Sequence, residues 1–100
     1  MSEKYKIHPE GTFFITLTVV GWIDVFTRRE YADEVIANLN YCIEHKGLKL
    51  YNYCIMPSHL HMICSAENGN LSDILRDFKS YTAKRIISLI ESNPTESRKD

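Results

Sequence analysis

Two histidines, His59 and His61, stand two positions apart in an apolar segment of the chain. Residues two apart on a β-strand project from the same face, so a strand here would aim both imidazoles at one point. Neutral imidazole nitrogens are common ligands of divalent metal ions. Leu60, Met62 and Cys64 would then point to the opposite face and pack in the core. The spacing indicates a metal-binding face, although a surface or structural histidine pair would have the same spacing.

Two imidazoles fill only part of the coordination shell of a divalent ion, so other ligands must come from the protein, water or substrate. Candidates for a third protein ligand, chosen by proximity in sequence, are His8, Asp24, Asn52 and Glu67. Coordination positions left open would allow the ion to polarise a phosphate oxygen.

The composition favours one soluble globular domain of 100 residues with an ordinary share of hydrophobic residues, 44%. Its formal net charge of -1 means that a nucleic-acid surface would have to come from local clusters of Lys and Arg. Three cysteines without a Cys-x-x-Cys spacing argue against a disulfide framework and indicate a reducing compartment, the cytoplasm. A polar N-terminus and the lack of a long apolar run argue against export and a membrane span.

The elements that must position the histidines follow from periodicity. Residues 13–20 are rich in β-branched and aromatic types and predict a first strand. Thr27 is the expected N-cap of a helix over residues 28–46, with Glu30 as its capping partner and Gly47 as the left-handed residue after its end.

Residues 48–55 predict a second strand and residues 59–65 a third, and the short break at Pro57 and Ser58 predicts an antiparallel hairpin between them. A long amphipathic helix should then run from Leu71, with Asn70 as its cap, until Asn93 and Pro94 end it.

The predicted order β-α-β-β-α is that of an α+β, ferredoxin-like unit, an antiparallel sheet with helices on one face, lacking its last strand and last helix. An open sheet edge is a hazard in a finished protein. We therefore expect either a partner chain at this edge or a natural protein that continues past Asp100, of which residues 1–100 would be a single N-terminal domain.

The residues around the histidines resemble a known family. The segment Met56–His61 (MPSHLH), the helix at 71–85 and the strand at 13–19 are similar to IS200/IS605-like (Y1, HUH) transposases, including the REP-associated tyrosine transposases. In that family a strand ends in Met-Pro-Asn-His and the next begins with His-hydrophobic-His. Ser58 replaces the commoner Asn. The resemblance covers roughly residues 10–90.

This resemblance implies a DNA transposase that cuts single-stranded DNA near a hairpin through a 5′-phosphotyrosine intermediate. His59 and His61 would bind Mg²⁺ or Mn²⁺, and the protein would act as a homodimer. The family's nucleophilic tyrosine lies on a later helix, which here would fall beyond Asp100. Tyr81, on the helix that follows the motif, is a weak candidate, for which packing or stacking on a base is the expected role.

Basic residues that could contact DNA phosphates lie on both predicted helices. They are Arg76, Lys79, Lys84 and Arg85 on the second helix and Arg28 and Arg29 at the start of the first. An ordinary solvated helix face would have the same composition.

Two other functions fit the same residues. One is a DNA-binding derivative that does not cleave, and the other is a ferredoxin-like regulatory or ligand-binding module with an incidental histidine pair.

Overall fold

The computed structural model describes residues 2–7, 11–18 and 25–92. The elements, in chain order, are β1 (Ser2–Ile7), β2 (Phe13–Thr18), the short 3-10 helix η1 (Val25–Thr27), α1 (Arg29–His45), β3 (Leu48–Ile55), β4 (His59–Ala66) and α2 (Leu71–Ser92). Val19, Val20, Asn93 and Pro94, which the sequence assigns to the end of a strand and the end of a helix, lie outside the described residues.

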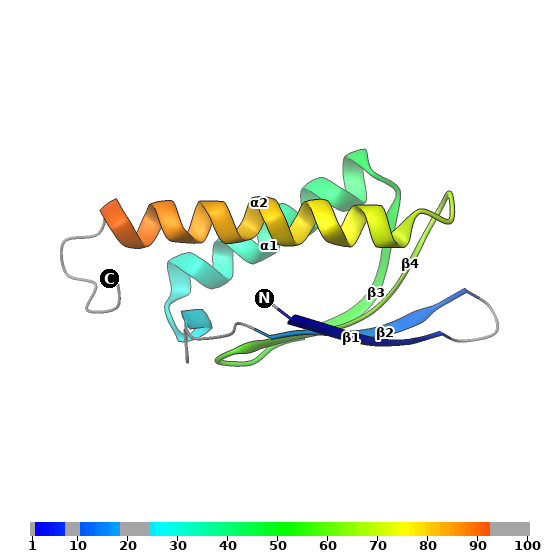
Figure 1. Cartoon of the computed structure of the whole chain (residues 1–100), viewed down its shortest axis with the longest axis horizontal. Coiled ribbons are helices and arrows are strands. Elements are labelled where there is room, and N and C mark those ends of the chain that lie inside the picture. Colours follow the sequence, from blue (N-terminus) through cyan, green and yellow to red (C-terminus); the bar gives the residue numbers. More distant parts are fainter. Residues whose placement is uncertain (1, 8–10, 19–24, 93–100) are drawn as a thin grey trace.

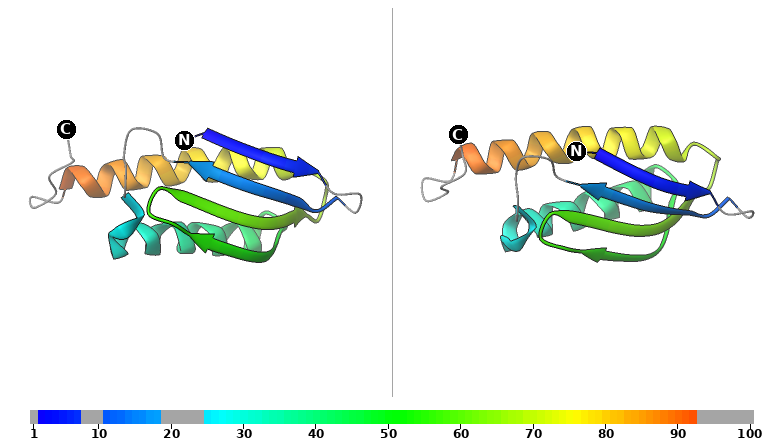
Figure 2. Two further views of the ribbon diagram at one scale, coloured as in Figure 1. Left: turned by 90° about the horizontal axis from the view of Figure 1, so that it is seen from below. Right: turned by 60° about the horizontal axis from the view of Figure 1, so that its bottom comes forward.

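The sheet has the strand order β1-β2-β4-β3, and every neighbouring pair is antiparallel. Both helices cover one face of this sheet (Figure 1). The opposite face of the four strands is uncovered in the two views of Figure 2, where the helices lie behind the sheet. From β2 onward the order is β-α-β-β-α, so the predicted α+β class and element order are confirmed.

Strand β1 is the element that the sequence did not predict. Its register runs from Ser2 opposite Thr18 to Ile7 opposite Phe13. Because β1 is antiparallel to β2, and β2 is antiparallel to β4, β1 runs parallel to β4. A final ferredoxin-like strand, crossing back from α2, would take this position and direction. The edge of β2 is therefore already paired, and the expectation of a partner chain at that edge loses its sequence-based reason.

The start of α1 also differs from the prediction. Thr27 ends η1 rather than capping α1, and the N-cap is Arg28, whose side chain makes no capping hydrogen bond. The carbonyl of Arg28 accepts the amides of Tyr31 and Ala32, both at 3.1 Å. At the other end, the expected left-handed Gly47 is confirmed by its φ of 79°.

The core lies between the helices and the inner face of the sheet. Its members alternate along β2 and β4 and recur at helical spacing along α1 and α2: Ile15, Leu17, Tyr31, Val35, Leu39, Cys42, Leu60, Met62, Cys64, Ile74, Leu75, Phe78, Ile86 and Ile90. The alternation forces the other half of each strand onto the uncovered surface. Within the three described ranges, neither helix has the length and apolar composition needed to cross a membrane.

Candidate metal centre

The hairpin between β3 and β4 sets where the histidine pair begins. The amide of Met56 donates to the His59 carbonyl at 2.8 Å, and the His59 amide donates back at 3.4 Å, which closes a two-residue loop of Pro57 and Ser58. The carbonyl of Pro57 accepts the amide of Phe26 at 2.9 Å. The 3-10 helix thus holds the turn, and β4 starts with a fixed alternation at His59.

The alternation along β4 divides its side chains between the core and the opposite surface, as predicted. Leu60, Met62 and Cys64 are at most 1% exposed and face the helices. His59 and His61 are half-buried on the opposite surface, here called the open face, which also carries Phe14, Thr16, Asn52, Cys54 and Ile63. The two imidazole rings are nearly parallel, with an interplanar angle of 4° and centroids 5.9 Å apart.

Each imidazole has a hydroxyl partner on the same ring nitrogen. Thr16 Oγ1 lies 3.1 Å from His61 Nδ1, and Ser58 Oγ lies 3.0 Å from His59 Nδ1. Thr16 stands directly opposite His61 in the register of β2 and β4, so strand pairing fixes this contact. With Nδ1 engaged on both rings, Nε2 is the nitrogen left on each ring for a ligand.

The pair fits a divalent ion by its separation and donor chemistry. A metal-bound imidazole nitrogen lies about 2.1 Å from the ion, so two rings on one ion have centroids at most about 6–7 Å apart. The observed 5.9 Å between His59 and His61 lies inside that limit. Parallel rings do not converge on one point, and sharing an ion requires a rotation about the broad χ2 torsion.

The described residues do not complete a coordination shell made of histidine, cysteine and carboxylate side chains: no group of three such residues in the described ranges could hold a metal ion. Among the suggested third ligands, Asn52 lines a hollow of about 160 Å³ together with His61. Glu67 follows the other end of β4 and donates its amide to the Gly47 carbonyl. His8 and Asp24 lie outside the described residues.

The hollow beside His61 contains side chains that the sequence argument did not single out. The ring of Phe14 is centred 6.3 Å from the His61 ring at an angle of 52°, and 43% of Phe14 is exposed. Cys54, opposite His61 in the β3–β4 register, has its thiol 3.7 Å from the sulfur of Met56. An exposed aromatic ring at this place can stack on an unpaired base.

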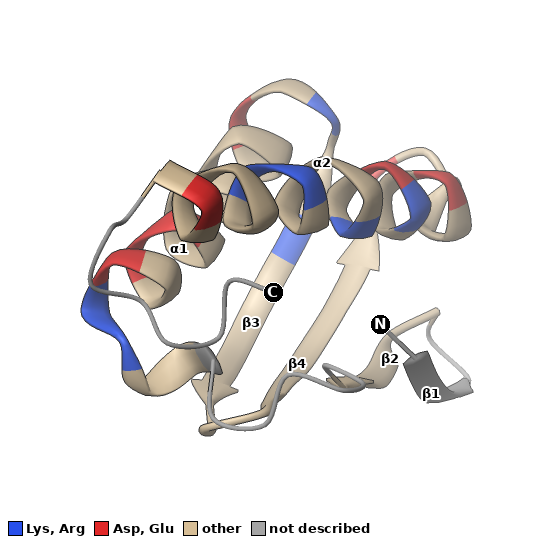
Figure 3. Ribbon diagram, turned by 60° about the vertical axis from the view of Figure 1, so that its left-hand side comes forward, with Lys and Arg blue, Asp and Glu red and all other residues tan. Residues whose placement is uncertain are grey.

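The charge of the open face suits a phosphate ligand. Strands β2, β3 and β4 contain no Asp or Glu. The acidic residues coloured in Figure 3 lie on the helical side, intermixed with basic ones, while β2 and β4 are uncharged. A phosphate approaching the histidine pair therefore meets no carboxylate on these three strands.

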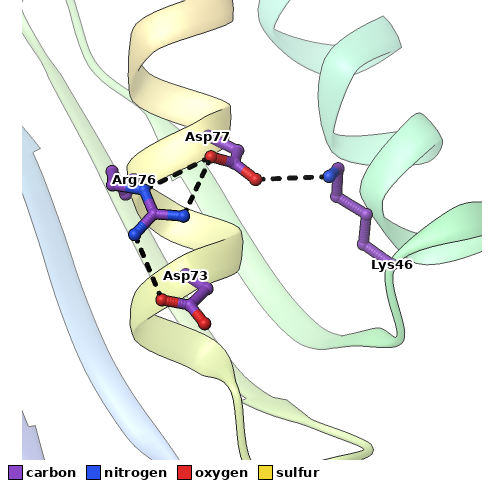
Figure 4. A network of polar contacts seen from close by, with 4 residues as sticks. All are labelled: Lys46, Asp73, Arg76 and Asp77. Carbon is purple, nitrogen blue, oxygen red and sulfur yellow. Dashed lines mark hydrogen bonds and ion pairs between the residues drawn. The ribbon is translucent and has the colours of Figure 1, made fainter.

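The basic residues predicted to contact DNA lie on the helices, across the sheet from the histidine pair. Arg76 is paired with Asp73 at 3.3 Å and with Asp77 at 3.4 Å, and Lys46 approaches Asp77 at 3.3 Å (Figure 4). The hydrogen bond from Lys46 lowers the pKa of the Asp77 carboxyl, assisted by Arg76. This network neutralises much of the charge that Arg76 could offer to a phosphate.

The other predicted cations differ in their surroundings. Arg85 pairs with Glu34 at 3.5 Å, and Arg29 lies 3.9 Å from Asp33. Lys84 is exposed on α2, Lys79 is half-buried there, and Arg28 is the N-cap of α1. The structure therefore does not bring the cations and the histidines into one site, and contacts of these residues with DNA stay a prediction.

Tyr81 lies on the helical side as well. It is 56% exposed and lines a groove between α1 and α2 together with Tyr41. Attack by Tyr81 on a phosphate held at His59 and His61 would have to occur across the sheet. The expected role of Tyr81 in packing or in stacking on a base stays a prediction.

Thr16 and Ser58 are the site residues whose role the sequence argument missed. Thr16 belongs to the first predicted strand, and the alternation there was visible in sequence. Its partner, however, lies 45 residues away, so only the pairing register of β2 and β4 reveals the contact.

Comparison with known proteins bears on the same segment. Residues 19–98 match the family described as transposase IS200 like, and this range contains α1, β3, β4 and α2 with both histidines. No curated protein and no solved structure matches the chain significantly. Since the family match covers well over half of the sequence, the chain belongs to the IS200-like transposase family.

Proposed function

We propose that the open face binds one divalent ion, Mg²⁺ or Mn²⁺, through His59 and His61, and that it presents this ion to a phosphodiester of single-stranded DNA. The observation that carries the proposal is the closeness of the two imidazoles, with centroids 5.9 Å apart on one face of β4, and the hydroxyl beside Nδ1 of each ring. The absence of carboxylates from β2, β3 and β4 supports a phosphate as the other ligand.

The reaction we propose for the transposase is cleavage with a covalent intermediate. The tyrosine hydroxyl gives up its proton as its oxygen forms a bond to phosphorus. The bond from phosphorus to the 3′ oxygen breaks and that oxygen takes up a proton, which leaves a 3′-hydroxyl end and a 5′-phosphotyrosine. The bound ion would offset the negative charge that develops on the phosphate oxygens. In this proposal His59 and His61 hold and orient the ion, and Phe14 beside His61 can stack on a neighbouring base.

The attacking tyrosine is proposed to come from a later segment of the natural protein. Among the exposed tyrosines of the described residues, Tyr53 lines the hollow beside His61, whereas Tyr51 and Tyr81 are poorly placed for this role. Tyr81 lies on the helical side, and the Tyr51 hydroxyl is 3.0 Å from Ser65 Oγ, near the far end of β4 from His59. A homodimer, which the family implies, and a cytoplasmic location, which the cysteine usage indicates, are further parts of this proposal.

Titration of the chain with Mn²⁺ tests the metal part. Wild-type protein should bind one ion, and both His59→Ala and His61→Ala should lose this binding. His45→Ala is the matched control, because this exposed histidine lies at the end of α1 with its ring 4.6 Å from that of Tyr41. Unchanged Mn²⁺ binding in both site variants would refute the metal centre.

DNA binding and cleavage are read in the same variants with an end-labelled hairpin oligonucleotide. Mn²⁺ should tighten binding of the wild-type chain, and the two histidine variants should lose this increment. A protein–DNA adduct that persists on a denaturing gel and disappears in Tyr81→Phe would contradict our placement of the nucleophile.

The second candidate is a DNA-binding derivative that does not cleave, and the positions of Tyr51 and Tyr81 are what favour it. It predicts hairpin binding that survives both histidine substitutions and does not respond to Mn²⁺. The family match argues against the third idea, an unrelated regulatory module with an incidental histidine pair.

A further inference from the structure

The two hydroxyl contacts at the histidine pair share a feature that strand geometry alone does not require. Both hydroxyls approach the same ring nitrogen, Nδ1, although they come from different elements: Thr16 from β2 and Ser58 from the turn before β4. Neither hydroxyl is placed at Nε2. The same choice on two independent rings suggests a common task.

The task concerns the position of one proton on each ring. A neutral imidazole carries a single N–H, either on Nδ1 or on Nε2, and a metal ion binds only the nitrogen that lacks it. A hydroxyl oxygen can accept a hydrogen bond from Nδ1–H, which leaves the lone pair on Nε2. In metal sites such a partner on the second nitrogen fixes both the tautomer and the orientation of the ring.

We propose that Thr16 and Ser58 are positioning residues, which accept hydrogen bonds from Nδ1–H of His61 and His59 and so hold both rings with Nε2 free for an ion. This inference deepens the proposed function and rests on it for the identity of the ligand. The assignment of the protons is a property of the metal-free chain and can be tested without an ion.

The choice of a hydroxyl instead of a carboxylate has a chemical consequence. A carboxylate on Nδ1 would add a negative charge beside the ion, and β2, β3 and β4 supply none. A hydroxyl orients the imidazole without that charge. The full charge of the ion then remains available to a phosphate, as expected for a centre that acts on DNA.

The register of the sheet makes the Thr16 contact specific. Thr16 is directly opposite His61, and Thr18 is directly opposite His59 on the same face of β2. Thr18 is therefore a close match for Thr16 in residue type, strand and face. Thr16 also precedes the range matched by the family, residues 19–98, so its role here comes from the geometry.

Long-range ¹H–¹⁵N correlation spectra of the histidine side chains read the tautomer directly in the metal-free chain. We expect His59 and His61 to be Nδ1–H tautomers. Thr16→Val should turn His61 into a mixture with the Nε2–H form, and Ser58→Ala should do the same to His59. Thr16→Ser, which restores a hydroxyl, should recover the wild-type signals, and Thr18→Val should leave them unchanged.

Mn²⁺ affinity is the second measurement. Loss of an outer partner of a metal-bound histidine lowers affinity about 10–100-fold, and we expect Thr16→Val near the lower end, with Thr16→Ser and Thr18→Val close to wild type. Far-ultraviolet circular dichroism establishes that each variant is folded. If Thr16→Val fails to fold, the tautomers of the wild-type chain and of the Ser58→Ala variant decide the question.

The two measurements separate the inference from the function on which it rests. Nε2–H tautomers in the wild-type chain would overturn the positioning role of both hydroxyls, whatever the metal does. Nδ1–H tautomers in a chain that binds no Mn²⁺ would overturn the metal centre and leave the role of the hydroxyls in orienting the rings.

Discussion

Replacing Thr82 by valine should destabilise the protein although it removes only a hydroxyl. Thr82 is 0% exposed on α2, and its Oγ1 accepts a hydrogen bond of 3.0 Å from Nδ2 of Asn38 on α1, which is 8% exposed. Valine has nearly the same shape as threonine, so no cavity is created. The amide of Asn38 would instead lose its acceptor while it remains largely buried.

The expected loss follows from this burial. Leaving a buried donor unsatisfied costs about 1–3 kcal/mol, and each 1 kcal/mol shifts the melting temperature of a domain of this size by about 4–8 °C. Thr82→Val should therefore melt roughly 4–24 °C below wild type. Urea unfolding curves give the free energy, and an unchanged slope with a lower midpoint would locate the effect in the folded protein.

A double-mutant cycle identifies the cause. Asn38→Leu alone leaves the Thr82 hydroxyl able to bond a carbonyl in the preceding turn of its own helix, so we expect it to be the milder change. The double variant should recover part of the loss, with a coupling energy of about 0.5–3 kcal/mol. A Thr82→Val protein within about 0.5 kcal/mol of wild type would refute the reasoning, since that is the range of neutral surface changes.

Three further predictions concern titration, thiol access and charge. Burial raises the pKa of the Cys64 thiol from 9.0 to about 11. The stability that the neutral buried thiol contributes is therefore complete below pH 9 and is lost as the pH rises toward 11. The urea midpoints of wild type and Cys64→Val should converge or cross between these two pH values. An aromatic disulfide reagent should label the exposed Cys54 at once, and Cys42 and Cys64 only on unfolding; fast labelling of two thiols would contradict the core. If the exposed Lys84 contacts a phosphate, Lys84→Ala should reduce the slope of log binding constant against log salt concentration, measured with single-stranded DNA, by about 0.7. Arg76→Ala should reduce this slope by less, because two aspartates already pair with Arg76. Equal slopes for these two variants would show that the ion pairs do not matter.

The parts of the fold that the sequence predicts are those with strong local periodicity. Strands β3 and β4 alternate or are rich in β-branched and aromatic residues, and α1 and α2 carry apolar residues at helical spacing, so their places were expected almost to the residue. Strand β1 has no such signal. It is an edge strand held by backbone hydrogen bonds to β2, and backbone pairing is compatible with a polar sequence such as Ser2–Lys6.

The prediction that Thr27 caps α1 was wrong for a related reason. The local signature of a threonine followed by Glu30 is a genuine capping pattern, yet the chain enters α1 from η1, which is bonded through Phe26 to Pro57 in the hairpin turn. A tertiary contact thus moved the cap to Arg28. Such contacts leave no trace in a window of a few residues.

The candidate site divides in the same way. The common face of His59 and His61 depends only on their spacing and was predictable. The hydroxyl of Thr16 reaches His61 only because β2 and β4 pair in the observed register. A shift of β2 by one residue would turn Thr16 to the core. The cations of α2 were predicted as a group. The pairs of Arg76 with Asp73 and Asp77 are local to α2, whereas the pairing of Arg85 with Glu34 on α1 and the place of the cations across the sheet come from tertiary packing.

Strand β1 also changes how association of this protein should be tested. The sequence led us to expect an open edge at β2 and hence a partner chain, but β1 pairs along that edge from Ser2 opposite Thr18 to Ile7 opposite Phe13. Removal of residues 1–10 should expose the backbone groups of β2, which carries Thr16 and the buried Ile15 and Leu17. Exposed edges of this kind pair with other chains.

The shortened chain should therefore be less stable and should associate more strongly with increasing concentration than the full chain in sedimentation equilibrium. The shortened chain should also bind Mn²⁺ more weakly, because β2 would no longer be paired with β1, and the register of β2 and β4 that sets Thr16 against His61 would be less well fixed. If instead the full chain is a stable dimer and the shortened chain a monomer, β1 itself forms the interface. Its outer edge, and not that of β2, would then be the surface that a second copy covers.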